Sequence, residues 1–119
     1  MIRAFTTGIS VAALGLITAL PATAQEPTGG VVSIGGAVTE IVFALGAQDQ
    51  LVARDTTSSY PPEAAALPDV GYMRALSPEG VLATGPKLII AEEGAGPPET
   101  IEVLEQADIP FVTVPDDYT

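Results

Sequence analysis

The chain has 119 residues, enough for one small domain, and its hydrophobic content of 47% predicts a folded protein rather than an acidic disordered tail. Its 4 Lys+Arg against 15 Asp+Glu give a formal net charge of -11, which argues against nucleic acid or an anionic membrane surface as a partner, because binding phosphates requires clustered cations. The absence of Cys excludes disulfides, thiol catalysis and a lipid-modified N-terminal Cys, and the absence of His excludes Ser-His-Asp chemistry.

Residues 1–24 have the pattern of a cleaved secretory signal peptide. Arg3 supplies a positive n-region, residues 4–20 form an apolar h-region, and Ala22-Thr23-Ala24 matches an A-x-A cleavage site. A transmembrane anchor is the alternative, but an apolar stretch of about 17 residues is at the short limit for spanning a bilayer. We expect export to the periplasm, a linker over residues 25–30 and, because no Cys follows the cleavage site, a soluble protein that is not a lipoprotein.

The remaining chain alternates predicted strands and helices. Apolar, β-branched runs predict buried strands at residues 31–34, 51–54, 87–91 and 111–114. Apolar spacing and capping residues predict helices at residues 39–45 with Gly46 as the stop, from the Ser77 N-cap to residue 84, and at 98–107. An extended turn is expected at residues 60–62. This alternation predicts an α/β fold with a parallel sheet in a single lobe over residues 31–119.

Ligands of open parallel sheets bind outside the carboxyl ends of the strands, so the loops that follow the strands are the candidates for function. Gly35-Gly36 could form an anion cradle, but the segment lacks the glycine motifs of nucleotide sites, and close backbone packing at a tight turn is the better interpretation. Glu92-Glu93 could perform acid–base chemistry, but neighbouring residues of a strand point to opposite faces. We interpret this pair as solvated loop charges.

Tyr72-Met73-Arg74 is the most informative triplet. A Tyr oxygen is a hard ligand suited to ferric iron, as in tyrosinate-ligated haem, and an Arg two residues away could stabilise the phenolate and lower its pKa. Taken alone, the triplet is better explained by a half-buried aromatic residue beside a surface charge. Tyr60 lies in a polar loop before two prolines and is either a cleft-facing contact or an aromatic lid on that loop.

The order of these segments resembles the N-terminal lobe of a periplasmic substrate-binding protein for ABC importers, of the cobalamin, siderophore and haem class. The matching segments are VVSIGG at 31–36, TEIVFALG at 39–46, LVARDTT at 51–57, YP at 60–61, LPDVGY at 67–72, LSPEGVL at 76–82 and PKLIIA at 86–91. Within that class, the run Gly71-Tyr72-Met73-Arg74 is similar to the haem-binding proteins of bacterial haem uptake.

The resemblance implies a role for each candidate residue. Tyr72 is expected to be the axial ligand of the haem iron, Arg74 the basic residue that hydrogen-bonds it, and Tyr60 a further cleft contact. Glu79 matches an acidic position that docks on arginines of the membrane permease, although an acid at a helix N-terminus is equally explained by the helix dipole. The implied function is a monomeric periplasmic haem-binding component of an ABC haem importer, which is not an enzyme.

The chain departs from this family in length. Such proteins have two lobes joined by one long helix, so we expect a truncated, single N-terminal lobe whose helix-facing surface is an exposed apolar patch. Three alternatives stay open. The ligand could be cobalamin or a ferric siderophore, although such pockets favour Trp and the chain has none. The protein could be a hydrolase that uses Glu92 or Glu93, or a truncated product that binds nothing.

Overall fold

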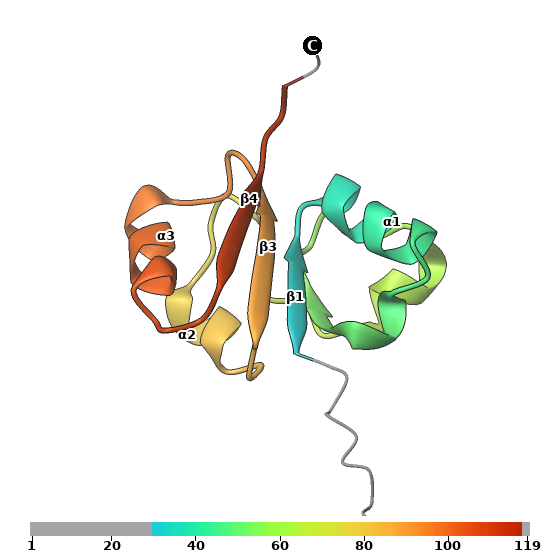
Figure 1. Cartoon of the computed structure of the whole chain (residues 1–119), viewed down its shortest axis with the longest axis horizontal. Coiled ribbons are helices and arrows are strands. Elements are labelled where there is room, and N and C mark those ends of the chain that lie inside the picture. Colours follow the sequence, from blue (N-terminus) through green and yellow to red (C-terminus); the bar gives the residue numbers. More distant parts are fainter. Residues whose placement is uncertain (1–29, 118–119) are drawn as a thin grey trace, which may run out of the picture.

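Four parallel strands form one sheet with helices on both faces (Figure 1). This computed structural model describes residues 30–117, so the predicted signal peptide and residues 25–29 of the predicted linker lie outside the described residues. The strands lie in the order β2-β1-β3-β4 and all neighbours are parallel. Their bounds are β1 Val31–Ile34, β2 Leu51–Arg54, β3 Leu88–Glu92 and β4 Phe111–Val114. The predicted single-lobed α/β fold with a parallel sheet is confirmed.

The helices are distributed in a doubly wound manner. The first helix covers one face of the sheet, and the other two cover the opposite face (Figure 1). Their bounds are α1 Gly36–Ala44, α2 Pro78–Leu82 and α3 Pro98–Glu105, with short 3-10 helices η1 Gln48–Gln50 and η2 Pro62–Ala66. The connection after β1 runs through α1 on one face of the sheet, and the connection after β3 runs through α3 on the other face. The direction in which the chain winds therefore reverses between the neighbouring strands β1 and β3.

The hydrophobic core lies between the sheet and the pair α2 and α3. Strand residues alternate between the two faces, and the buried core members are Val32, Ile34, Ala53, Met73, Leu76, Val81, Ile89, Ala91 and Leu104. The opposite face is less completely covered. Ile41 of α1 and Leu45, the residue that caps it, are 52% and 76% exposed, and Val112 of β4 is 47% exposed. These apolar side chains are exposed on the α1 side of the sheet.

Some element ends differ from the prediction for identifiable reasons. The first helix begins three residues early, because Gly35 at φ 109 turns the chain out of β1 directly into the helix. The 3-10 helix η2 was not predicted, because Pro61-Pro62 was interpreted as an extended turn and Pro62 instead begins a helical turn. The second helix ends at Leu82 rather than 84, β3 lies one residue later, and α3 ends at Glu105 rather than 107. No helix within residues 30–117 is long and apolar enough to cross a membrane.

Candidate functional site

The carboxyl ends of the parallel strands all lie at the same end of the sheet, which we call the carboxyl edge. The loops at this carboxyl edge form the candidate site. These loops comprise Gly35 after β1, residues 55–61 after β2 and residues 93–97 after β3. In doubly wound sheets the ligand crevice lies where the winding reverses, which here is between β1 and β3. The side chains at this carboxyl edge are therefore the candidates for contacts with a ligand.

The place between the carboxyl ends of β1 and β3, where the winding reverses, is occupied by the side chain of Glu92. Glu92 Oε2 accepts a hydrogen bond of 3.0 Å from the backbone N–H of Ala37 in the first turn of α1. A Cβ on Gly35 would lie 2.5 Å from Glu92 Cδ, so only glycine leaves room for this carboxylate. The helix N-terminus that could have held an anion already holds one. Gly35-Gly36 thus serves close packing, as interpreted, whereas the interpretation of Glu92 as a solvated loop charge is wrong.

Glu92 and Glu93 do not converge. Both residues line a hollow beside α3, together with Ile101, but their carboxylates have different partners, and that of Glu92 is Ala37 N of α1. Glu93 accepts a 3.0 Å hydrogen bond from the backbone N–H of Asp116. The described residues contain no group of three or more acidic side chains that could hold a metal ion. The geometry therefore offers no carboxylate pair for acid–base chemistry at this position.

A buried aspartate organises the loop that follows β2. The Asp55 carboxylate is fully buried and accepts hydrogen bonds from Gly35 N (2.8 Å), Ser58 Oγ (2.7 Å), Thr57 N (3.1 Å) and Thr57 Oγ1 (2.8 Å). A second chain of hydroxyl contacts joins Ser58 to Thr39 of α1 at 2.7 Å. A buried carboxylate requires such donors to offset its lost hydration. The network fixes the end of β1 to the end of β2. It was not predicted, because residues 55–59 are recognisable from the sequence only as a polar run.

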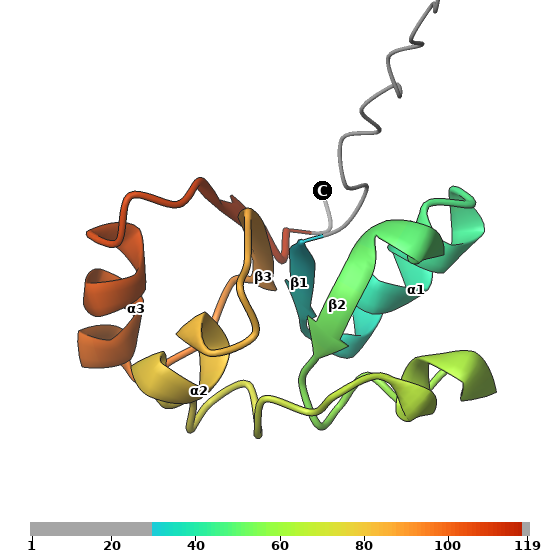
Figure 2. The same cartoon turned by 90° about the horizontal axis from the view of Figure 1, so that it is seen from below.

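Residues 71–76 cross the carboxyl edge and are anchored at both ends. At the first anchor, Gly71 O accepts from Thr56 N at 2.9 Å, and Gly71 N donates to Asp69 Oδ1 at 2.8 Å. At the second, Gly96 N donates to Met73 O at 2.8 Å, and Leu76 N donates to Gly96 O at 2.9 Å. Figure 2 shows this part of the chain passing from the β2 side of the sheet to α2. The segment that contains Tyr72 is thus tied to the loops after both β2 and β3.

Tyr72 and Arg74 lie on the outward side of this segment. Met73 between them is only 9% exposed and packs in the hydrophobic core, whereas Tyr72 is 47% exposed and Arg74 is also exposed. The buried methionine therefore directs its two neighbours away from the core. The predicted iron ligand and its predicted basic partner are thus both exposed, two residues apart in the segment that crosses the carboxyl edge.

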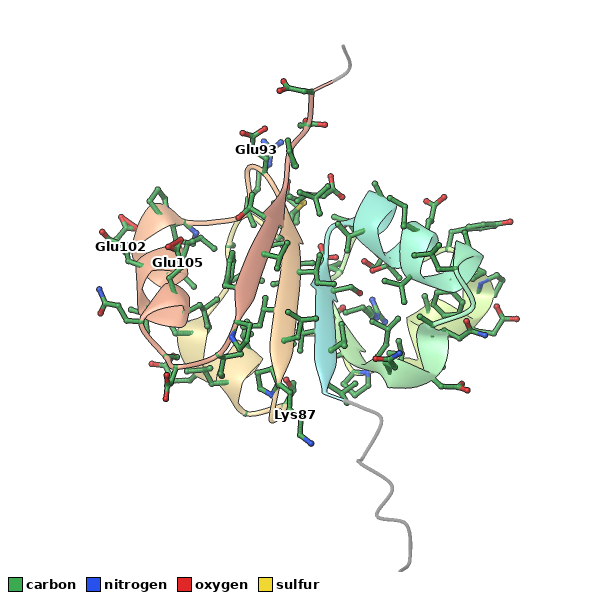
Figure 3. The ribbon with its side chains drawn as sticks, viewed as in Figure 1. Lys87, Glu93, Glu102 and Glu105 are labelled. Atoms are coloured by element: carbon green, nitrogen blue, oxygen red, sulfur yellow. The ribbon has the colours of Figure 1, made fainter. Side chains whose placement is uncertain are left out.

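Arg74 is the available cation of this edge. The other cations within residues 30–117 are Arg54 and Lys87. Arg54 is 12% exposed and is engaged by the Asp69 carboxylate at 3.3 Å and by the carbonyl of Ala65 at 2.8 Å. Lys87 precedes β3 and lies at the opposite edge of the sheet from Glu93, which follows β3 (Figure 3). Among the three cations of residues 30–117, Arg74 is therefore the exposed one in the segment that crosses the carboxyl edge.

Tyr60 lines a different hollow. It is 65% exposed and lines an open, largely apolar groove against the outer side of α1, together with Glu40, Ile41, Phe43, Ala44 and Pro61. The residues that line this groove do not include Tyr72 or Arg74. The structure thus groups Tyr60 with α1, and Tyr72 with the anchored segment.

Glu79 lies in the first turn of α2, shortly after the anchored segment. The backbone N–H of Glu79 and the hydroxyl of Ser77, which donates to Oε2 at 2.9 Å, lower the pKa of the Glu79 carboxyl. Ser77 Oγ also accepts from Gly80 N at 3.3 Å, which confirms the predicted N-cap. Glu79 is exposed and stays ionised well below neutral pH. It is therefore a fixed negative charge on the surface.

Comparison with known proteins places this geometry in a family. The model of the periplasmic binding protein family matches residues 31–119. The vitamin B12-binding protein of Vibrio parahaemolyticus is 36% identical over 88 residues, which are 74% of this chain and 32% of that protein.

Two solved structures have the same fold. The periplasmic heme-binding protein RhuT from Roseiflexus sp. RS-1, in apo form, is 44% identical with a TM-score of 0.71 and covers 74% of this chain and 34% of that one. A periplasmic heme-binding protein from Pseudomonas aeruginosa is 45% identical with a TM-score of 0.69 and covers 71% of this chain and 30% of that one. The present chain spans about a third of the length of these relatives.

Proposed function

The chain belongs to the periplasmic binding protein family, and we propose that it is the haem-binding component of an ABC importer. In this role it captures haem in the periplasm and delivers it to an inner-membrane permease. The family consists of substrate-binding transport proteins rather than enzymes, and its neighbours in the comparison bind haem or vitamin B12. We accordingly propose that the chain itself has no enzymatic activity and acts as a monomer.

The observation that carries this proposal is that Tyr72 and Arg74 are both exposed in the segment that crosses the carboxyl edge of the sheet. A phenolate oxygen is a hard donor that suits ferric iron, and this ligand is known in haem proteins. The positive charge of Arg74 attracts the carboxylates of the haem propionates. Tyr60 is proposed as a further contact, at the side of the cleft against α1.

Cobalamin is the second candidate ligand, because one reported relative is a vitamin B12-binding protein. One observation favours haem. The chain contains no Trp and few Arg, whereas a large corrin ring with amide side chains calls for extensive aromatic and polar contacts. A ferric siderophore stays a third possibility within the same family.

Hemin titration followed by absorption spectroscopy tests the proposal. The wild-type chain should give a ferric tyrosinate-type spectrum, Tyr72→Phe should lose it, and Tyr60→Phe should keep it as the matched control. Arg74→Gln should weaken binding, and Arg74→Lys should restore part of the loss. An unchanged spectrum in Tyr72→Phe would show that Tyr72 is not the ligand. If cobalamin displaces hemin in competition and binds more tightly, cobalamin is the ligand instead.

We further propose that Glu79 docks on arginines of the permease. Its support is an exposed carboxylate that its neighbours keep ionised. Glu79→Gln should leave hemin binding unchanged but reduce association with the permease, and loss of both would show a role in the ligand site. We also propose that residues 1–24 direct export and are removed. N-terminal sequencing of the exported protein should then find Gln25 as its first residue.

A further inference from the structure

The side chain of Asp69 is the centre of the first anchor of the Tyr72 segment. Its Oδ1 accepts from Gly71 N at 2.8 Å and from Thr56 Oγ1 at 2.9 Å. Its Oδ2 accepts from Arg54 Nη1 at 3.3 Å and also from Thr56 Oγ1 at 3.1 Å. One carboxylate thus joins the last residue of β2, the loop that follows it and the residue immediately before Tyr72.

Gly71, the residue before Tyr72, has a backbone conformation that its own packing does not hold. Its φ of 105° lies in the region that favours glycine, and an added Cβ would meet nothing within 4 Å, so neither packing nor a side chain restricts the backbone there. Tyr72 is 47% exposed, and core packing does not fix its side chain either. Buried Met73 and the hydrogen bond from Ala75 N to Tyr72 O at 2.8 Å fix the backbone on the C-terminal side of Tyr72. The hydrogen bonds of Gly71 fix it on the N-terminal side, and Asp69 accepts the only one that Gly71 N makes among the described residues.

Asp69 is itself held against the sheet. Arg54 carries the guanidinium that contacts it, and the same side chain donates to the carbonyls of Leu67 (3.1 Å) and Ala65 (2.8 Å). The backbone of this region is also paired, since Arg54 N donates to Pro68 O at 3.0 Å and Val70 N donates to Arg54 O at 2.9 Å. The carboxylate is consequently fixed relative to β2 rather than to a free loop.

We propose that Asp69 is the positioning residue of the ligand site, which fixes Gly71 and thereby holds Tyr72 in the orientation that binds the ligand. This inference rests on the proposed function, because it concerns the presentation of the proposed iron ligand. Asp69 does not touch the ligand in this account and acts only through Tyr72. Partners that orient a metal ligand typically change affinity by about 10-fold to 100-fold when they are removed.

The test compares Asp69→Ala, Asp69→Asn and the control Asp49→Asn. Asp49 lies in η1, which precedes β2, so the control removes the same charge at the opposite edge of the sheet. We expect Asp69→Ala to weaken hemin binding by about 10-fold. Asp69→Asn keeps an oxygen for Gly71 N and loses mainly the charge toward Arg54, so we expect a loss of about threefold or less. Asp49→Asn should bind hemin like the wild type.

Two further measurements separate positioning from general destabilisation. Amide hydrogen exchange at Gly71 in the hemin-free chain should become faster in Asp69→Ala, while that of core strand β1 stays slow. In a Tyr72→Phe background, Asp69→Ala should not weaken the residual hemin binding any further, because the residue acts through Tyr72.

The possible failures point to different conclusions. If exchange at Gly71 accelerates but hemin affinity and spectrum are unchanged, Asp69 is a structural residue and the positioning inference is overturned, while the proposed function stands. The same holds if Asp69→Ala costs as much affinity in the Tyr72→Phe background as in the wild type. If the wild-type chain gives no Tyr72-dependent hemin spectrum, the proposed function fails and the inference fails with it.

Discussion

Replacing Gly35 by alanine should destabilise the lobe through two separate effects. Gly35 has φ 109 and ψ 134, a conformation open almost only to glycine, so alanine there costs about 2 kcal/mol of backbone strain. The new methyl group would also occupy the place of the Glu92 side chain, with Cδ and Cγ both at 2.5 Å. Glu92 must then swing away and lose its hydrogen bond to Ala37 N, which costs about 1 kcal/mol at a helix N-terminus. We therefore expect a loss of about 3 kcal/mol in the free energy of unfolding.

Urea denaturation followed by far-ultraviolet circular dichroism measures this loss. Gly46→Ala is the matched control, because Gly46 also has a positive φ of 73° but an added Cβ there meets nothing within 4 Å. This control should cost only about 1–2 kcal/mol of strain. In Glu92→Ala the displaced side chain is already gone, so Gly35→Ala combined with Glu92→Ala should be about as stable as Gly35→Ala alone. The contact between Gly35 and Glu92 would be refuted if the losses in free energy of unfolding from Gly35→Ala and Glu92→Ala were strictly additive. It would also be refuted if Gly35→Ala and Gly46→Ala caused equal losses.

Three further changes test other parts of the structure. Asp55→Ala leaves several buried donors unpaired and should lower the free energy of unfolding by about 3 kcal/mol or more in urea, with Asp55→Asn milder. Ser77→Ala should cost about 1 kcal/mol through loss of the N-cap and should raise the pKa of Glu79, which carboxyl NMR titration reports. The folded-state pKa of Glu79 is depressed, so the stability that its ionised form contributes is present above pH 4.5 and is lost as the pH falls through the folded-state pKa. Ser77→Ala should therefore make the free energy of unfolding fall less steeply at acid pH. Leu104→Ala should cost about 2–5 kcal/mol and its exposed neighbour Val103→Ala well under 1 kcal/mol by the same urea assay, and similar losses would contradict the assigned core face of α3.

The strands could be predicted from sequence because their signal is local. The run at 111–114 forms β4 with the predicted bounds, and β3 differs from the predicted strand by one residue. The beginning of α1 could not be predicted, because two glycines oppose helix formation locally. Their cost is offset by contacts from distant residues, since Gly35 N donates to Asp55 and the Glu92 carboxylate caps Ala37.

The candidate site likewise has one part that could be predicted from the sequence and one part that could not. The Tyr72-Met73-Arg74 triplet was identifiable from residue types, and the burial of Met73 explains why its neighbours face outward. The anchors of the segment were not identifiable, because they join backbone groups far apart in the sequence. Met73 O accepts from Gly96 N, and Gly71 O from Thr56 N, and no local pattern marks either contact.

The anchors of residues 71–76 should determine how Tyr72 coordinates a ligand, but they do not determine how tightly the ligand binds. Every hydrogen bond named above that ties residues 71–76 to other parts of the chain involves Thr56, Asp69 or Gly96, all within this lobe. The lobe by itself should thus determine how Tyr72 meets an iron atom, and the absorption spectrum reports that coordination. Affinity instead grows with the ligand surface removed from water, and one edge of one sheet supplies a single wall of a cleft. A tyrosinate-type spectrum with weak hemin binding is therefore the combination that this lobe should give, whereas tight binding without that spectrum would place the ligand elsewhere.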